Sequence, residues 1–115
     1  MKILVINGPN LNLLGERNVE TYGSKTLDEL MMSIKKTEAS KGYRFKFYQS
    51  NHEGAIIDTI HKERMWADGI LINAGAFSHY SFAIRDAIEA VSIPTVEVHL
   101  SNIMEREDFR KISVL

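Results

Sequence analysis

Ile3-Leu-Val-Ile-Asn-Gly-Pro-Asn10 begins with a short apolar run that is rich in β-branched residues, and it ends in residues that form turns. A strand covered on both faces of a parallel sheet has such a continuous apolar sequence, whereas a strand with one wet face alternates. The pattern therefore predicts a central, buried strand at residues 3–6, with polar residues at its carboxyl end.

Polar residues also follow two later apolar runs, as Asn-Ala-Gly-Ala at residues 73–76 and as Glu-Val-His-Leu-Ser-Asn at residues 97–102. Ligands of open parallel α/β sheets bind outside the carboxyl ends of the strands. Asn and Gly are also common turn residues, which is the simpler explanation of any single loop. Three loops of the same character instead predict a binding site at this edge of the sheet.

Further apolar patterns predict three helices and three more strands. Thr26 and Glu29 have the spacing of a capping box and Gly42 is a typical helix stop, so the first helix is expected at residues 26–41. The alternation in residues 43–49 is typical of an edge strand with one partly exposed face. The other helices are expected at residues 53–66 and from residue 79 to before Pro94, and the other strands at residues 69–72 and 95–100.

Strands and helices therefore alternate along the chain, which is the pattern of an α/β fold with right-handed crossovers and helices on both faces of one parallel sheet. We expect a flavodoxin-like three-layer sandwich with strand order 2-1-3-4. A long connection at residues 11–25 joins the first strand to the first helix. Long loops in compact domains are usually lids or disordered segments, and this one begins beside the predicted site.

The composition is that of an ordinary globular chain. Its 115 residues are 44% hydrophobic and 25% charged, which predicts a single domain over residues 1–115. A formal net charge of −1 without a basic patch argues against a nucleic-acid partner. The absence of Cys excludes disulfides and thiolate chemistry, and no segment resembles a signal peptide or a membrane span. We therefore expect a cytoplasmic protein without a membrane partner.

The first loop argues against a nucleotide site. It has one Gly followed by Pro9, and it matches neither the dinucleotide fingerprint nor the phosphate-binding loop with its Lys. A phospho-acceptor domain of similar topology would need acidic residues where this chain has Asn7, Asn10 and Asn73. The four His residues have no paired ligand spacing on one helix, so a metal site would require tertiary convergence.

Two His residues are candidates for chemistry. Strand alternation places Glu97 and His99 on one face of the last strand. A lone His in a strand is often structural, but a position at the carboxyl end favours a catalytic role. His79 is predicted to begin the third helix, whose N-terminus favours anions. The alternative for His79 is a helix cap, a role that Ser78 or Ser81 would also serve.

Tyr22 and Arg17 lie together in the long connection. A Tyr has a reference pKa of about 10, so it acts as a general base near neutral pH only where positive charge stabilises its phenolate. Arg17, partly desolvated by a closing lid, and a second cation such as Arg106 would supply that charge. On local sequence alone, an exposed Tyr on a flexible loop is the simpler interpretation.

Five ordered motifs spread over nearly the whole chain carry a family resemblance. They are Val-Ile-Asn-Gly-Pro-Asn-Leu-Asn-Leu-Leu-Gly-Glu-Arg at residues 5–17, Tyr-Gly at 22–23, Gln-Ser-Asn-His-Glu-Gly at 49–54, Ile-Asn-Ala-Gly-Ala at 72–76 and Glu-Val-His-Leu-Ser-Asn at 97–102. With these motifs the chain closely resembles the type II 3-dehydroquinate dehydratases.

The resemblance implies dehydration of 3-dehydroquinate to 3-dehydroshikimate, in the shikimate pathway or in quinate catabolism, by anti elimination through an enolate and without metal, cofactor or Schiff base. It makes Tyr22 the base that removes the C2 proton, with Arg17 steadying negative charge. His99 becomes the acid that protonates the departing C1 hydroxyl, with Glu97 orienting it. Asn10 would hold a water that stabilises the enolate oxygen.

The resemblance also implies a set of residues that bind the substrate. The set is Asn73, His79, Asp86, Leu100, Ser101, Arg106 and Arg110. Asp86 would reach the site of a neighbouring subunit in a trimer, and family members usually assemble four trimers into a dodecamer. Asn51 and His52 match a motif of the family, but they receive no chemical role.

One departure from the family is large. Family chains continue past the position of Leu115 with a fifth strand and a closing helix. Without that unit the fourth strand would be a bare edge, so we hypothesise a chain truncated at its C-terminus. A different class of function also stays open, in which a flavodoxin-like module binds a small molecule or signals through the same strand ends without turning a ligand over.

Overall fold

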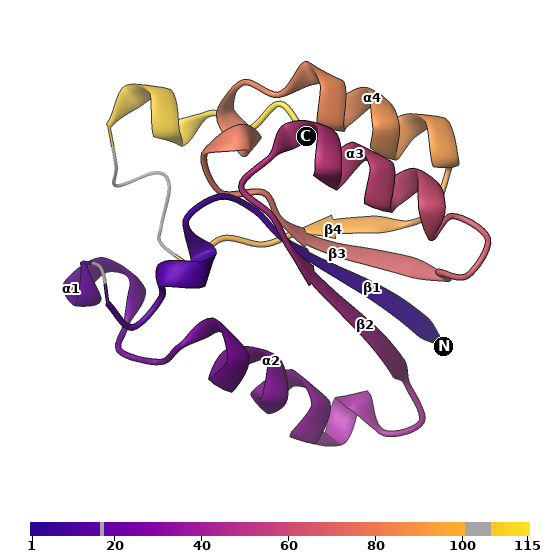
Figure 1. Cartoon of the computed structure of the whole chain (residues 1–115), viewed down its shortest axis with the longest axis horizontal. Helices are drawn as coiled ribbons and strands as arrows, with labels where there is room; N and C mark the ends of the chain where they lie inside the picture. Colours follow the sequence, from indigo (N-terminus) through magenta and orange to yellow (C-terminus); the bar gives the residue numbers. More distant parts are fainter. Residues whose placement is uncertain (17, 101–106) are drawn as a thin grey trace.

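A four-stranded parallel sheet organises the part of the chain that the computed structural model describes, residues 1–16, 18–100 and 107–115 (Figure 1). The strands are β1 (Lys2–Asn7), β2 (Arg44–Gln49), β3 (Gly69–Asn73) and β4 (Thr95–Glu97), in the order β2-β1-β3-β4. The predicted order 2-1-3-4 is therefore confirmed. Asn7 is in register with Asn73, so β1 and β3 end at the same level.

Helices cover both faces of the sheet, which confirms the predicted three layers (Figure 1). α2 (Leu27–Lys36) lies on one face, and α3 (Glu53–Lys62) and α4 (Phe82–Val91) pack together on the other. Short helical segments occupy the connections. They are η1 (Leu11–Leu13), α1 (Val19–Tyr22), η2 (Glu38–Ser40), η3 (Gly75–His79) and η5 (Asp108–Lys111).

The hydrophobic core lies between the sheet and the layer of α3 and α4. Alternate residues of β1 and β3 point to this face and meet apolar residues of both helices. The buried cluster comprises Leu4, Ile6, Ile56, Ile60, Ile70, Ile72, Ala74, Ile84 and Ala87. Because each fully buried Leu or Ile stabilises the fold by about 1.5–3 kcal/mol, this cluster fixes β1 and β3 firmly, and with them the loops at their carboxyl ends.

The opposite face is packed more loosely. α2 has no fully buried residue, and a cleft of about 310 Å³ lies between it and Val5, Leu71 and Val98 of the sheet side. Val96, which pairs with Leu71 and so points to the same face, is 60% exposed. The two helical layers therefore hold the sheet with unequal strength.

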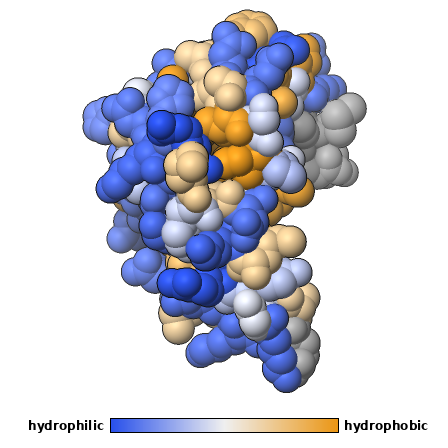
Figure 2. Space-filling view, turned by 90° about the vertical axis from the view of Figure 1, so that its right-hand side faces the viewer, coloured by the Kyte–Doolittle hydropathy of each residue, from blue (hydrophilic) through white to orange (hydrophobic). Residues whose placement is uncertain are grey.

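The outer surface is largely polar on the face that Figure 2 shows, where hydrophobic side chains gather in a small area among hydrophilic ones. Isolated apolar surface of this kind is normal for a globular domain. In the described ranges of the chain, no helix is long and apolar enough to cross a membrane.

The first helix begins as predicted but ends early. The Thr26 hydroxyl oxygen accepts the backbone N–H of Glu29 at 3.2 Å, which is the N-cap that the sequence predicts. The helix ends at Lys36 rather than near residue 41. Thr37 adopts an extended backbone, and its hydroxyl donates to the Ile34 carbonyl oxygen at 3.0 Å, so the side chain competes with the helix for that acceptor.

Two further elements are shorter than predicted. α3 ends at residue 62 rather than 66, because the backbone of residues 63–67 turns back toward the sheet. β4 ends at Glu97 rather than at residue 100. Since β3 leaves the sheet after Asn73, the last ladder bond is the one from the Val98 N–H to the Ile72 carbonyl oxygen at 2.9 Å.

Candidate active site

The loops that follow β1 and β3 touch at the carboxyl edge of the sheet. The Gly8 N–H donates to the Asn73 carbonyl oxygen at 2.7 Å, and a Cβ on Gly8 would lie 2.4 Å from the carbonyl oxygen of Ala74. Only glycine fits so close an approach. The buried Asn73 side chain accepts the N–H of Gly75 at 3.2 Å, so its amide is held beside this contact.

We expect Gly8→Ala to lower the free energy of unfolding by about 1–3 kcal/mol, because the added methyl would overlap the backbone of Ala74 and overpacking costs about this much. Gly54→Ala is the matched control. Gly54 lies in α3, a Cβ there meets nothing within 4 Å, and Ala in a helix is favoured over Gly by up to about 1 kcal/mol. Urea denaturation measures both changes, and an unaltered stability of Gly8→Ala would contradict the tight contact.

Asn10 lies just before η1 in a left-handed backbone conformation, with φ of 69°. Asn adopts this conformation more readily than most residues other than Gly. Its backbone N–H donates to Oδ1 of Asn51 at 2.9 Å, and the residue is exposed. The loop after β1 thus presents Asn10 to solvent at the edge of the sheet, with a bond from the loop after β2.

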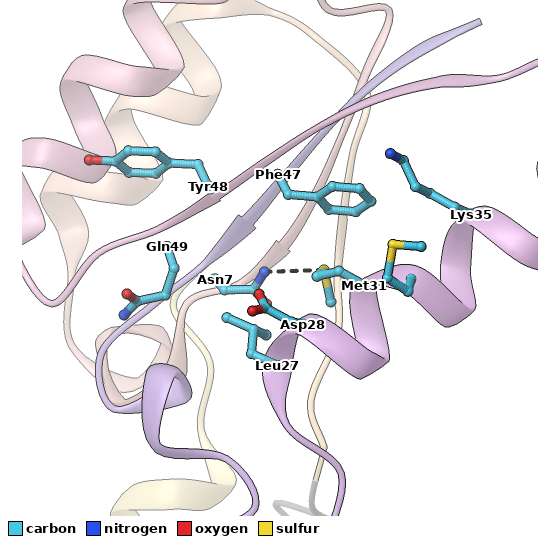
Figure 3. A pocket seen from close by; sticks show the side chains of 9 residues that line it. Asn7, Leu27, Asp28, Met31, Lys35, Phe47, Tyr48 and Gln49 are labelled. Atoms are coloured by element: carbon cyan, nitrogen blue, oxygen red, sulfur yellow. Dashed lines mark hydrogen bonds between the residues drawn. The ribbon is translucent and has the colours of Figure 1, made fainter.

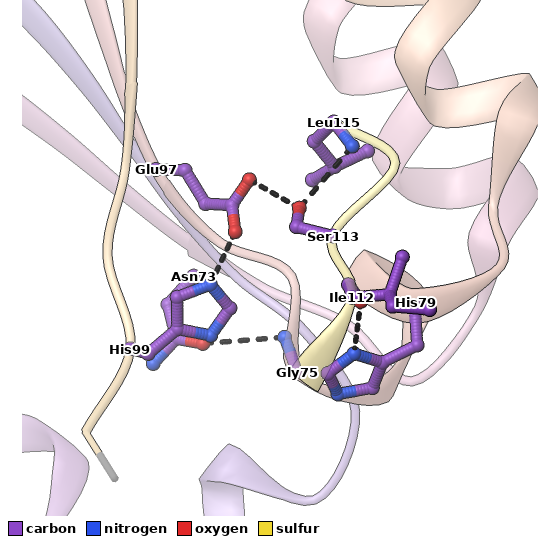
Figure 4. Close-up of polar contacts among 8 residues, drawn as sticks. All are labelled: Asn73, Gly75, His79, Glu97, His99, Ile112, Ser113 and Leu115. Carbon is purple, nitrogen blue, oxygen red and sulfur yellow. Dashed lines mark hydrogen bonds and ion pairs between the residues drawn. The ribbon is translucent and has the colours of Figure 1, made fainter. Parts of the chain in front are cut away.

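Glu97 and His99 form a direct pair at the carboxyl end of β4 (Figure 4). His99 Nε2 bonds to one carboxylate oxygen of Glu97, and the other oxygen accepts the Ser113 hydroxyl at 2.6 Å. The side chains of His99 and Glu97 are 21% and 22% exposed. In the described ranges, no group of three or more His, Asp or Glu side chains is placed to hold a metal ion. The contact with Glu97 is made by Nε2, so Nδ1 is the other ring nitrogen of His99.

His79 lies at the end of η3, so the prediction that it begins a helix is wrong. Tyr80, with φ of −152°, interrupts the helical path, and α4 starts only after Ser81. Ser81 caps that helix by accepting the N–H of Ile84 at 3.1 Å, as the sequence left open. His79 Nδ1 instead lies 2.7 Å from the carbonyl oxygen of Ile112, to which it donates (Figure 4).

The other predicted substrate contacts lie in different parts of the structure. Asp86 is exposed on α4, and Leu100 is 41% exposed and lines the cleft on the α2 side. Arg110 in η5 pairs with Glu107 at 2.9 Å and covers the ring of Phe109. η5 packs against η3, which brings Arg110 to the side of the molecule that carries His79. Arg17, Ser101 and Arg106 lie outside the described residues.

Tyr22 ends α1 and is half-buried. α1 projects from the sheet beyond the strand ends, apart from β4 (Figure 1). α1 and the end of β4 both lie on the side to which the carboxyl ends of the strands point (Figure 1).

A second cleft on the α2 side, of about 270 Å³, opens between α2 and β2 (Figure 3). Met31 and Phe47 form apolar walls, Gln49 lies at one end, and the Asn7 amide points inward and donates to the Met31 sulfur at 3.5 Å. Apolar walls of this kind suit apolar groups rather than a polyhydroxylated acid. The polar loops at the strand ends are therefore the better candidate site.

Comparison with known proteins shows the family to which the chain belongs. The sequence matches the family described as dehydroquinase class II over residues 1–115. The chain belongs to the class II dehydroquinase family. The resemblance that the five motifs indicated is thereby confirmed.

Relatives and solved structures of class II dehydroquinases agree with this assignment. The chain is 55% identical to the 3-dehydroquinate dehydratase of Caldicellulosiruptor bescii over 115 residues, which is 99% of this chain and 79% of the relative. It is similar to the crystal structure of the type II dehydroquinase from Butyrivibrio crossotus, with a TM-score of 0.95, 55% identity and coverage of 99% of this chain and 80% of that one. The structure from Propionibacterium acnes matches with a TM-score of 0.91 and 39% identity, over 98% and 78% of the two chains.

Two residues of this class II dehydroquinase contact candidate site residues without having been assigned a role from sequence. Ser113 bonds to Glu97 across sixteen positions of sequence, and no local pattern signals such a contact. Asn51 bonds to Asn10, and its place in the motif at residues 49–54 was the only signal for it. Both contacts depend on which loops the fold brings together.

Proposed function

We propose that this chain dehydrates 3-dehydroquinate to 3-dehydroshikimate by anti elimination through an enolate. Membership of the class II dehydroquinase family supports the reaction, as do relatives named 3-dehydroquinate dehydratase. The observation that carries the chemistry is the pair of Glu97 and His99 at the end of β4, beside the strand end that holds Asn73. An elimination needs a group that protonates the departing hydroxyl, and a His oriented by a carboxylate is suited to this task.

The steps follow from the groups available. Tyr22 takes the C2 proton, and the electron pair of the C–H bond moves onto the C3 carbonyl oxygen to give the enolate. Arg17 stabilises negative charge on this side, and Asn10 holds a water that donates to the enolate oxygen. As the enolate collapses, the bond between C1 and its hydroxyl breaks, and His99 delivers a proton so that the hydroxyl leaves as water. Glu97 keeps the imidazole oriented.

This mechanism requires the connection at residues 11–25 to close over the bound substrate. Figure 1 shows α1 apart from β4, and this separation supports a movement that brings Tyr22 to the substrate. Lid closure of this kind excludes water and completes a catalytic site in many enzymes. The open arrangement is compatible with substrate entry.

Substrate contacts come from polar groups that suit a polyol acid. The proposed set is Asn73, His79, the backbone of Leu100, Ser101, Arg106 and Arg110, with Asp86 from a neighbouring subunit. Buried or anchored polar groups discriminate strongly in favour of ligands that satisfy them, because an unsatisfied partner costs free energy.

We expect Asp86→Ala to lower turnover and mixed subunits to restore part of it. Asp86 is exposed on α4, where it is available to a neighbour in a trimer. Trimers mixed from Asp86→Ala and Tyr22→Phe subunits contain sites in which an intact Tyr22 meets an intact Asp86. Recovery of activity on mixing, with sedimentation velocity to establish the trimer, checks this expectation. No recovery in mixed trimers would contradict a contribution across subunits.

The proposal extends to a dodecamer of four trimers and to a cytoplasmic location.

Growth of ultraviolet absorbance from the conjugated enone on addition of 3-dehydroquinate tests the function. We expect turnover that borohydride does not abolish, which separates this mechanism from one that uses a Lys Schiff base. Binding of 3-dehydroquinate without any growth of absorbance would favour the alternative of a non-catalytic binding module.

A further inference from the structure

The side chains of Gln49 and Asn51, at the end of β2, bind the loop that carries Asn10. Asn51 Oδ1 accepts the Asn10 backbone N–H at 2.9 Å and the Gln49 side-chain N–H at 3.2 Å. Gln49 Nε2 also donates to the carbonyl oxygen of Gly8 at 3.1 Å. Two linked side-chain amides therefore tie the loop after β1 to the end of β2.

The same loop is fixed on its other side by the end of β3. Gly8 donates to the Asn73 carbonyl oxygen at 2.7 Å and has no room for a Cβ against Ala74. A Cβ on Gly75 would lie 3.2 Å from the carbonyl oxygen of Pro9. The loop is thus held between two neighbouring strand ends, and the amides of Gln49 and Asn51 form its β2 side.

The backbone of Asn10 needs such support. Its φ of 69° is in the left-handed region, which Asn adopts more readily than most residues but which still costs free energy relative to Gly. The bond from Asn51 is made to the N–H of this same residue. Since the backbone conformation sets the direction of the side chain, loss of that bond frees the Asn10 amide to reorient.

We infer that Asn51, oriented by Gln49, is a positioning residue that fixes Asn10 for the elimination. The inference rests on the proposed function, in which Asn10 holds the water on the enolate oxygen. Groups aimed at developing charge act mainly on the transition state, so a displaced Asn10 lowers kcat more than it raises KM. A misplacement of about 1 Å in such a group lowers rates by up to about 100-fold.

Two substitutions of Asn51 distinguish the effect of its acceptor oxygen from the effect of the size of its side chain. Asn51→Leu removes the oxygen, and we expect kcat to fall about tenfold with KM within about twofold. Asn51→Asp keeps an oxygen for both donors, and we expect kcat within about twofold of wild type. His52→Ala changes the neighbouring exposed side chain and keeps the backbone N–H that donates to Ser50 Oγ, so it serves as the matched control, with an expected kcat equal to that of wild type.

A double-mutant cycle distinguishes positioning from a general structural effect. In an Asn10→Ala background, Asn51→Leu should lower kcat by less than about twofold further, because the group that it positions is already absent. A full tenfold loss in that background, or equal losses in Asn51→Leu and Asn51→Asp, would overturn the inference.

The hydrogen-exchange rate of the Asn10 backbone N–H measures the bond to Asn51 without any need for turnover. We expect exchange about tenfold faster in Asn51→Leu than in wild type or Asn51→Asp. If the wild-type protein does not convert 3-dehydroquinate, the proposed function fails. The exchange rates still show whether Asn51 holds the backbone of Asn10. Equal exchange in all three proteins would contradict that contact even if the enzyme is active.

Discussion

Tyr22→Phe is expected to abolish removal of the C2 proton while the protein still binds substrate. A positioned general base contributes about 10²–10⁴-fold to rate, so turnover should fall by at least that much. Affinity should stay within about tenfold, since one phenolic hydrogen bond is worth on the order of 1 kcal/mol. Absorbance of the conjugated enone reports turnover, and exchange of the C2 proton into heavy water reports the first step alone.

Tyr43→Phe is the matched control for this result. Tyr43 is 44% exposed and precedes β2, at the amino end of the sheet, so loss of its hydroxyl should leave turnover unchanged. Exchange of the C2 proton at the wild-type rate in Tyr22→Phe would refute the assignment of Tyr22 as the base.

His99→Ala is expected to slow loss of the hydroxyl more than exchange of the C2 proton. Enolate formation precedes departure of the hydroxyl, so an enzyme without its acid still exchanges the proton while product formation falls by about 10²–10⁴-fold. Glu97 keeps its bond from Ser113 in this variant, which limits the disturbance of the site. Product formation and deuterium incorporation in the same reaction give the two rates.

His99→Gln and His61→Ala sharpen this experiment. Gln keeps a hydrogen-bond donor but does not release a proton, so its failure separates acid catalysis from binding. His61 is exposed in the last turn of α3, and its loss should change neither rate. An equal fall of exchange and product formation in His99→Ala would place His99 before the enolate and contradict its role as the acid.

Much of the fold follows from the sequence because its elements carry strong local signals. The apolar run at residues 3–6, the cap at Thr26 and the alternation in β2 each have a direct physical cause, and the strand order is confirmed. The ends of elements were harder to predict. The Thr37 side chain that ends α2 acts through a local bond, and the length of β4 depends on where β3 leaves the sheet.

In the candidate site, too, local sequence patterns predict some features, and the contacts between distant elements are not predicted. Alternation placed Glu97 and His99 on one face, and the structure brings them into direct contact. The predicted position of His79 at the start of α4 is wrong, since a tight turn at Tyr80 separates this residue from the helix. The Ser113 contact joins elements that are distant in sequence, so composition and periodicity carry no information about it.

The unequal packing of the two faces divides the proposed chemistry between a rigid and a pliable part of the molecule. Asn73 lies at a strand end anchored by the buried core, whereas Tyr22 precedes α2, the helix without a fully buried residue. Segments with few buried apolar contacts open at low free-energy cost. If Tyr22 acts as the base in the proposed mechanism, tighter packing of α2 is expected to raise the stability of the fold and to slow the movement that the mechanism requires.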